Sequence, residues 1–173
     1  MAMATELREP KDLAELYERD FYAWARHQAS ALRDFHATRP NLPLDLEHLI
    51  EEVDDLADAK LGAVKSQLRR LIVHYLKLEY SPARPLRRKW EVSIVDAQNE
   101  IENDMTASIR EATASDLGRV YAGARRLAAA ELIEHDELEA ARALPEACPY
   151  TLDQLIDETW RPTNRHDLTD DTS

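Results

Sequence analysis

The chain has 173 residues and a formal net charge of −12, and its composition combines 44% hydrophobic and 32% charged residues with only 3 glycines. This length fits one domain with a core of its own, and the composition favours an all-helical protein. No apolar run approaches about 18 residues and no apolar signal segment is visible, so we expect neither a membrane span nor secretion. The single cysteine, Cys148, cannot form an internal disulfide, which fits the reducing cytoplasm.

The first predicted element is a helix over residues 12–37. Its apolar residues recur at three- and four-residue spacing, which is typical of the buried face of a helix. They are Leu13, Leu16, Tyr17, Phe21, Trp24, Leu32 and Phe35. Residues 1–11 show no such periodicity, and we expect them to form a flexible tail.

The second predicted element, residues 43–80, is the longest. No proline occurs between Pro43 and Pro82, and Asp45 is placed to cap the N-terminal end of a helix. At about 1.5 Å per residue this helix would be roughly 55 Å long. Acidic residues are concentrated in its first half and basic residues in its second half.

A third helix is predicted over residues 86–112. Because only a short proline-containing break separates it from the long helix, we expect the two to pack antiparallel. In that arrangement the numbers of facing residues add up to about 165. Arg69 should then lie near Asp96, and Lys65 near Glu100.

Three shorter elements are predicted after the hairpin. Ser115 is placed to cap a fourth helix, and a short helix should follow at about 135–144. Thr151 and Gln154 have the spacing of a capping box, which predicts a last amphipathic turn ending at Trp160.

The predicted fold class is therefore all-α. We expect a helical bundle built on a long antiparallel hairpin, residues 43–80 and 86–112, with an N-terminal helix and shorter C-terminal helices. It should form a single domain over residues 12–160, with flexible tails at 1–11 and 161–173.

Five blocks of the sequence form one pattern, in order along the chain. They are YERDFYAW (17–24), LEHLIEEVDDL (46–56), LRRLIVHYLKLEYSP (68–82), the segment 90–101 and CPYTLDQLIDETWRP (148–162). Together they resemble the bacterial domain-of-unknown-function family number 29. The resemblance implies an all-helical bacterial domain. It implies no activity and transfers no catalytic residue.

The acidic first half of the long helix is a candidate metal site. Glu51, Glu52 and Asp55 resemble one half of the paired carboxylate blocks of helical nucleotide pyrophosphatases. The other half would have to come from the acids of the next helix, which are Asp96, Glu100 and Glu102. In the predicted register the two groups lie roughly 15 Å apart along the bundle, so they cannot share one ion. We favour a salt-bridged or solvated face, with a metal held by the first group as the alternative.

The positive charge of the chain is concentrated between residues 65 and 89. The basic residues there are Lys65, Arg69, Arg70, Lys77, Arg84, Arg87, Arg88 and Lys89. They predict an anion or partner patch, while the net charge of −12 disfavours nucleic acid. Arg69 and His74 also match the R-x-x-x-x-H spacing of helical ribonucleases. A five-residue offset turns the two side chains about 140° apart, so a structural histidine is the favoured interpretation.

A third apolar heptad row of the long helix, Leu61, Leu68 and Tyr75, is predicted to stay partly uncovered and to form an interface. We therefore expect a homodimer or another protein partner. The function favoured by these observations is a non-catalytic helical interaction or accessory protein of the bacterial cytoplasm, with no cofactor. The alternative is an enzyme that acts on nucleotides or RNA through a metal at the acidic residues, or through His74 in the basic segment.

Overall fold

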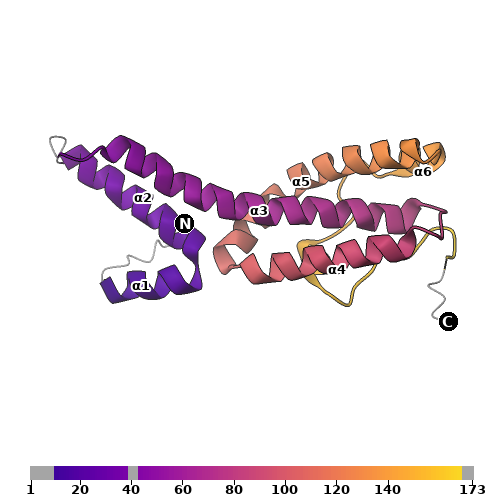
Figure 1. Cartoon of the computed structure of the whole chain (residues 1–173), viewed down its shortest axis with the longest axis horizontal. Coiled ribbons are helices and arrows are strands. Elements are labelled where there is room, and N and C mark those ends of the chain that lie inside the picture. The colour runs from indigo at the N-terminus through magenta and orange to yellow at the C-terminus, as the bar shows by residue number, and fades with distance from the viewer. Residues whose placement is uncertain (1–9, 39–42, 169–173) are drawn as a thin grey trace. The chain divides into compact units, whose positions relative to one another are not determined.

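Helices make up the regular structure of the described chain. The computed structural model describes residues 10–38 and 43–168, and these contain seven helices and no strand (Figure 1). They are α1 (Pro10–Arg19), α2 (Phe21–Thr38), α3 (Leu46–Tyr80), α4 (Arg87–Asp104), α5 (Ala107–Glu134), α6 (Leu138–Ala143) and α7 (Leu152–Ile156). The predicted all-α class is confirmed. Within these residues, no helix combines the length and the apolar character that crossing a bilayer requires.

The contacts of the chain divide into two compact units, where the sequence predicts one domain over residues 12–160. Unit 1 runs to Gly62 and takes in Thr106–Glu111, and unit 2 contains Ala63–Met105 and the chain from Ala112 onward. The length of α3 explains the division. Its 35 residues are about twice the 18 residues of α2 and of α4, so each half of α3 needs a different partner.

The predicted helix over residues 12–37 is two helices, because the chain breaks at Asp20. The Oδ1 atom of this buried residue accepts a hydrogen bond from the backbone N–H of Ala23 at 3.0 Å and so caps α2. The carboxylate also accepts hydrogen bonds from Ser108, at 3.1 Å from N–H and 2.6 Å from Oγ, and from Thr106 Oγ1 at 3.0 Å. One carboxylate therefore anchors the start of α2 and the start of α5.

The predicted helix over residues 86–112 is also interrupted. It ends at Asp104, and Met105 has extended backbone angles. Thr106 then begins α5 by accepting a hydrogen bond on Oγ1 from the N–H of Ile109 at 3.4 Å. The predicted cap, Ser115, lies inside α5 instead, because the helix already starts where Thr106 and Asp20 satisfy its first N–H groups.

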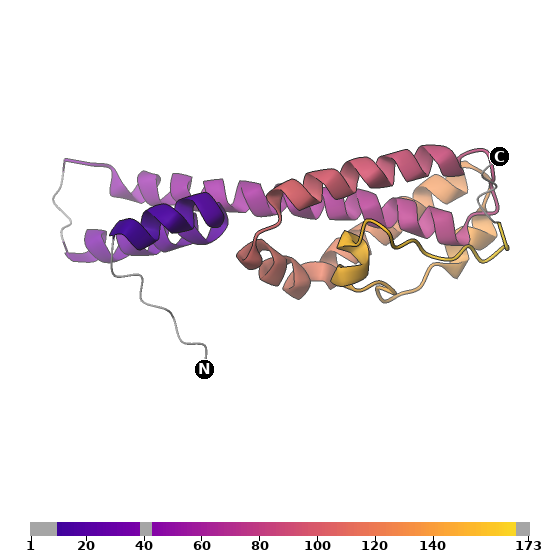
Figure 2. The same cartoon turned by 90° about the horizontal axis from the view of Figure 1, so that it is seen from below.

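In unit 2, α4 runs antiparallel to the second half of α3, as predicted (Figures 1 and 2). Arg70 Nη2 lies 3.7 Å from Asp96 Oδ2, which is one residue away from the predicted pair of Arg69 with Asp96. The other predicted contact, between Lys65 and Glu100, is replaced. Lys65 Nζ binds Asp116 of α5 at 2.7 Å.

The last carbonyl groups of α3 are capped by residues from the other end of the chain. Asn164 Nδ2 donates to Leu78 O at 2.6 Å, the N–H of Arg165 donates to Glu79 O at 2.9 Å, and His166 Nε2 lies 3.0 Å from Tyr80 O. These carbonyls have no partner within the helix itself. The segment 161–168, predicted to be flexible, is therefore held against α3.

The predicted capping box at the start of α7 is present. Thr151 Oγ1 accepts from the N–H of Gln154 at 3.2 Å, and Gln154 Oε1 accepts from the N–H of Thr151 at 2.9 Å. The predicted tail over residues 1–11 lies largely outside the described residues, although α1 already begins at Pro10.

Replacing Asp20 with alanine should destabilise the fold by about 1.5–3 kcal/mol, since several donors would lose a charged acceptor. Urea unfolding of Asp20→Ala measures the loss. Asp34→Ala, which removes an exposed aspartate from α2, serves as the control and should change stability by less than about 0.5 kcal/mol. Equal stability of the two variants would contradict a capping role for Asp20.

The stability difference between wild type and Asp20→Ala should depend on pH. Burial raises the pKa of Asp20, but the hydrogen bonds from Ser108, Ala23 and Thr106 outweigh burial and lower the pKa below the ordinary value of 3.8. A depressed carboxyl pKa contributes stability above the unfolded value and loses it as the pH falls through the folded value. The stability difference between wild type and Asp20→Ala should therefore shrink only below about pH 3.8.

Candidate functional site

Two acids at the start of α3 are neutralised by α2. Arg26 Nη1 binds Asp54 Oδ1 at 2.9 Å, and the second nitrogen of the same guanidinium binds Asp58. Arg33 also binds Asp54. These pairs join the two helices of unit 1, so the inner part of the acidic segment is a salt-bridged face.

The acids proposed for a metal site lie on the outside of this segment. Glu51, Glu52 and Asp55 are all exposed. Within residues 10–38 and 43–168, no group of three or more His, Cys, Asp and Glu side chains is arranged to hold a metal ion. The geometry therefore gives these three side chains no common ligand position.

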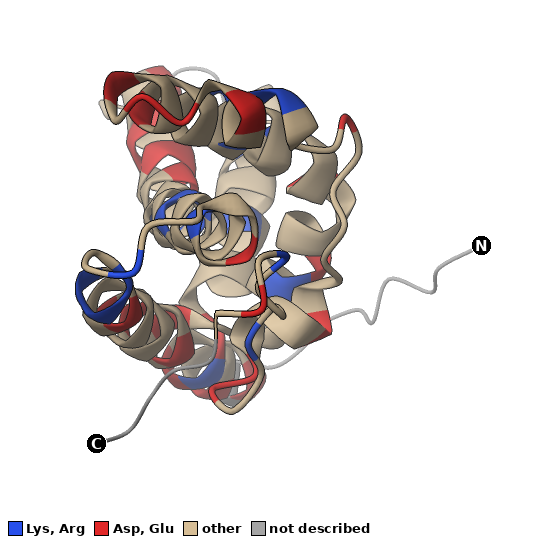
Figure 3. Ribbon diagram, turned by 90° about the vertical axis from the view of Figure 1, so that its right-hand side faces the viewer, with Lys and Arg blue, Asp and Glu red and all other residues tan. Residues whose placement is uncertain are grey.

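The basic residues between 65 and 89 do not form one surface. Three of them are engaged inside unit 2, because Lys65 and Lys77 bind acids of α5 and Arg87 donates to Leu78 O. The other five are exposed, and they are Arg69, Arg70, Arg84, Arg88 and Lys89. Figure 3 shows acidic and basic positions mixed along the ribbons. The anion or partner patch therefore remains a prediction for these five exposed residues, on α3 and around the start of α4.

Lys77 illustrates how this charge is used. Its Nζ atom binds Glu131 Oε2 of α5 at 2.6 Å and lies 5.1 Å from the centre of the Trp90 ring of α4. The lysine is only 6% exposed. A buried ammonium group is tolerated when it has such a partner, and removal of that partner is costly. Lys77 therefore ties α3, α4 and α5 together.

Arg69 and His74 have separate environments. Arg69 Nε lies 3.5 Å from the position that a Cβ atom would occupy at Gly123. The absence of a side chain there lets the guanidinium lie against α5. Burial, and then the charge of Lys77, lower the pKa of His74 to about 4. Its Nδ1 atom is buried without a hydrogen-bond partner in the described chain. The imidazole of His74 is therefore neutral at pH 7 in the folded protein.

The third apolar row of α3 is not a free surface. Leu68 and Tyr75 are fully buried within unit 2, and Leu61 is half-buried. The prediction that this row forms an interface is therefore wrong at Leu68 and Tyr75. Tyr75 is covered by Tyr150 and Trp160 from the C-terminal segment, which periodicity along α3 cannot reveal.

A network that no sequence motif indicates lies in unit 2, where the C-terminal segment meets α3 and α4. Its centre is apolar. The rings of Tyr75, Tyr150 and Trp160 contact one another edge to face, with centroids 5.4 to 5.7 Å apart. Tyr75 Oη donates a hydrogen bond to Trp160 O at 3.1 Å, so the phenol also fixes the backbone of the segment.

Gln98 of α4 holds the same segment through its amide. Its Nε2 atom donates to Asp157 O at 3.0 Å, to Leu155 O at 3.4 Å and to Tyr75 Oη at 3.2 Å. Gln98 is 4% exposed. Because α7 ends within these residues, the glutamine supplies donors to carbonyls that the short helix leaves unpaired.

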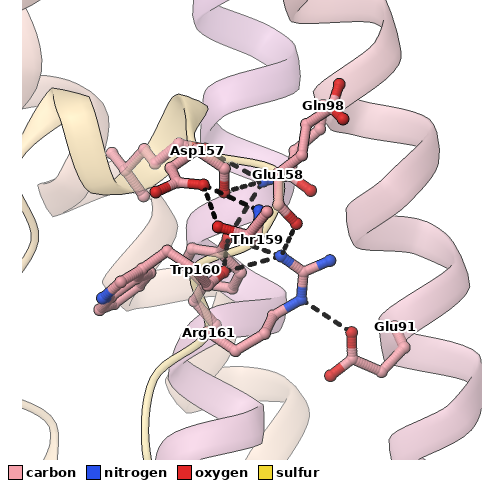
Figure 4. A network of polar contacts seen from close by, with 9 residues as sticks. Glu91, Gln98, Asp157, Glu158, Thr159, Trp160 and Arg161 are labelled. Atoms are coloured by element: carbon pink, nitrogen blue, oxygen red, sulfur yellow. Dashed lines mark hydrogen bonds and ion pairs between the residues drawn. The ribbon is translucent and has the colours of Figure 1, made fainter.

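Arg161 closes the network (Figure 4). Its Nε atom binds Glu91 Oε2 of α4 at 2.9 Å, while Nη1 donates to Glu158 O at 2.9 Å and to Trp160 O at 2.7 Å. The guanidinium therefore stabilises the turn formed by residues 157–161 and links this turn to α4. Charge-assisted hydrogen bonds of this kind are stronger than neutral ones.

Two titratable groups beside this network, Tyr150 and Cys148, are held in their protonated forms. Burial, together with the nearby carboxylate of Glu79, raises the pKa of Tyr150, whose Oη donates to Glu79 Oε2 at 2.9 Å. Burial also raises the pKa of Cys148, whose Sγ donates to Tyr150 O at 3.3 Å. A thiol with a raised pKa is a poor nucleophile, so the arrangement suits cohesion rather than covalent catalysis.

A pocket of about 270 Å³ opens beside the network. Its lining combines three apolar residues, two glutamates and one glutamine from α4 and the end of α7, namely Gln98, Ile101, Glu102, Met105, Ile156 and Glu158. The site thus pairs a rigid network with a small hollow of mixed polarity.

Residues 16–161 match the sequence pattern of the family described as "Domain of unknown function DUF29". The chain belongs to the DUF29 family. This confirms the resemblance drawn from the five sequence blocks. Three of those blocks meet in the network, since Tyr75, Gln98 and residues 150–161 come from the third, fourth and fifth of them. The DUF29 pattern therefore includes the contacts that fasten the C-terminal segment.

A solved structure supports the same fold. The DUF29 chain is similar to an α-helical protein of unknown function from Rhodospirillum rubrum, with 29% sequence identity and a TM-score of 0.73. The similarity covers 83% of this chain and 90% of the other. A comparison with the curated proteins gives no match.

Replacing Arg161 with glutamine should loosen the C-terminal segment. Loss of the charged donor should cost about 1.5–3 kcal/mol locally, which accelerates amide exchange over residues 150–166 roughly tenfold or more. Hydrogen exchange followed by mass spectrometry measures this. Arg142→Gln, which removes an exposed arginine from α6, is the control. Unchanged exchange in Arg161→Gln would show that the network does not hold the segment.

The lowered pKa of His74 predicts a pH effect on stability. Its pKa falls from 6.5 to about 4 in the folded state, so the unfolded chain takes up the proton first as the pH decreases. His74 therefore contributes stability above pH 6.5, and this contribution is lost between pH 6.5 and 4. Wild type should lose on the order of 1–2 kcal/mol more than His74→Gln across that window, after allowance for solvent screening.

Urea unfolding at intervals across the window measures this difference. His135→Gln replaces an exposed histidine and should follow the wild-type curve. If His74→Gln also followed that curve, the folded protein would not be holding His74 in its neutral form.

Proposed function

We propose that this DUF29 protein is a non-catalytic interaction protein of the bacterial cytoplasm that binds a basic amphipathic helix of a protein partner. The binding surface is the outer side of the first half of α3, in unit 1. The observation that carries the proposal is the exposure of Leu49 and Leu56, which are 45% and 52% exposed. They lie seven residues apart and therefore on one side of the helix.

The spacing of the two leucines favours a helical partner. Two turns of helix separate them, and an amphipathic helix presents apolar anchors at the same interval. Single exposed apolar residues are ordinary, but an aligned pair offers a continuous strip. Unit 1 also carries other exposed large apolar side chains, which are Tyr17, Phe35 and Leu44.

The charge around the strip favours a basic partner. Glu52 and Asp55 are exposed between and beside the two leucines, and acidic residues outnumber basic ones among the described residues of unit 1. If two copies of the chain paired antiparallel through Leu49 and Leu56, Glu52 of each copy would face Glu52 of the other, which is unfavourable. The homodimer predicted from the sequence is therefore the second candidate for this surface.

The non-catalytic part of the proposal rests on how the candidate catalytic groups are used. Arg69 lies against Gly123, and His74 is held neutral by burial. Asp54 and Asp58 are paired with arginines of α2. These groups serve packing and helix pairing, which supports a binding role over the alternative of nucleotide or RNA processing.

A synthetic helical peptide tests the proposal. It carries leucines at seven-residue spacing flanked by lysines, and a matched peptide carries glutamates in place of the lysines. Fluorescence anisotropy should show binding of the lysine peptide only, weakened by salt. The double variant Leu49→Gln/Leu56→Gln should weaken binding about tenfold or more, because two apolar anchors are lost.

Val92→Gln/Val95→Gln is the matched control, because it removes two exposed apolar residues from α4 in unit 2. Equal binding of the two peptides, or equal loss in the two double variants, would contradict the proposal. Sedimentation decides between the candidates. Self-association that salt strengthens and Leu49→Gln/Leu56→Gln abolishes would assign the surface to a second copy instead.

A further inference from the structure

The pocket beside the C-terminal network has two distinct parts. Its apolar part is formed by Ile101 and Met105 of α4 and by Ile156 at the end of α7. Its polar lining residues are Gln98, Glu102 and Glu158, and the two glutamates give this part its negative charge. A ligand that fits both parts must have an apolar stem and a cationic end.

The walls of the pocket are fixed before any ligand arrives. Gln98 holds Asp157 O at 3.0 Å, and Arg161 holds Glu158 O at 2.9 Å (Figure 4). The N–H of Thr159 donates to Asp157 Oδ1 at 2.8 Å, which stabilises the turn that carries Glu158. A preorganised pocket does not spend binding energy on ordering its own residues.

The two carboxylates are available to a cation. Arg161, the neighbouring base, directs Nε to Glu91 and Nη1 to carbonyl groups of its own turn. No ion pair to Glu102 or Glu158 occurs within residues 10–38 and 43–168, and both residues are exposed. The negative charge of these two glutamates is therefore available to a cationic ligand.

The size of the pocket limits what it can hold. A volume of about 270 Å³ is below the range of roughly 300–1,000 Å³ that is usual for pockets that enclose whole ligands. A volume at this lower limit suits a small ligand group such as one long side chain.

We propose that this pocket binds an arginine side chain presented by a basic peptide. The three methylene groups of arginine lie against Ile101, Met105 and Ile156, and the guanidinium reaches Glu102 and Glu158. Arginine fits better than lysine because its planar fork can donate to two carboxylates at once and is more weakly hydrated. The site lies on unit 2 and is independent of the leucine strip on α3.

Methionine NMR tests this directly. The chain has 3 methionines, of which Met105 lines the pocket, so a chain labelled at the methionine methyl groups gives a simple spectrum. The probe is acetyl-Gly-Arg-Gly-amide, and the matched probe has neutral citrulline in place of arginine. The arginine peptide should shift the Met105 signal saturably, with a dissociation constant of about a millimolar, as expected for one side chain.

Glu102→Gln/Glu158→Gln should weaken this binding about fivefold or more, because both carboxylate acceptors are lost. Glu100→Gln/Glu139→Gln removes the same charge from exposed positions outside the pocket and should leave the affinity within about twofold. The proposal is overturned if citrulline shifts Met105 equally, if Met105 does not shift, or if the two double variants behave alike. Since the tripeptide has no apolar face, these results do not depend on Leu49 and Leu56.

Discussion

The 35-residue helix α3 is longer than every element that packs against it, so several elements must share the task of covering it. α2 supplies one half of the cover through small residues such as Ala25 and Ala29, together with arginines that bind the acids of α3. α4, α5 and the C-terminal segment supply the other half. The division into two units, the position of the buried lysine and the docking of residues 161–168 all follow from that requirement.

Periodicity along the sequence predicts the elements that extend over many residues. It predicts the all-α class, the long helix and the antiparallel register to within one residue at Asp96. It does not predict the breaks at Asp20 and Thr106, because the apolar spacing continues across the first, and the second depends on a carboxylate far away in the chain. Only the local cap, Thr151 with Gln154, has a signature in neighbouring residues.

The network around the C-terminal segment could not be predicted from the sequence, for a related reason. Gln98 and Arg161 donate mainly to backbone carbonyl groups. Every residue has such a group, so the sequence does not indicate which ones will accept these hydrogen bonds. Some of the charged residues that the sequence singles out are paired inside the units, as Lys77 and Asp54 illustrate. What remains for partners is therefore found among residues that look unremarkable in the sequence, namely two leucines on α3 and a small hollow beside α4.

The capping of α3 by Asn164, Arg165 and His166 also bears on how the protein is made. A ribosome releases the chain from its N-terminal end, so α3 emerges long before the residues that complete it. Until residue 166 is free, the carbonyl groups of Glu79 and Tyr80 lack their partners from residues 165 and 166, and Tyr75 lacks its aromatic neighbours. Unit 2 can therefore close only after almost all of its chain has been synthesised, and during translation its apolar helices depend on the cell's protection against aggregation.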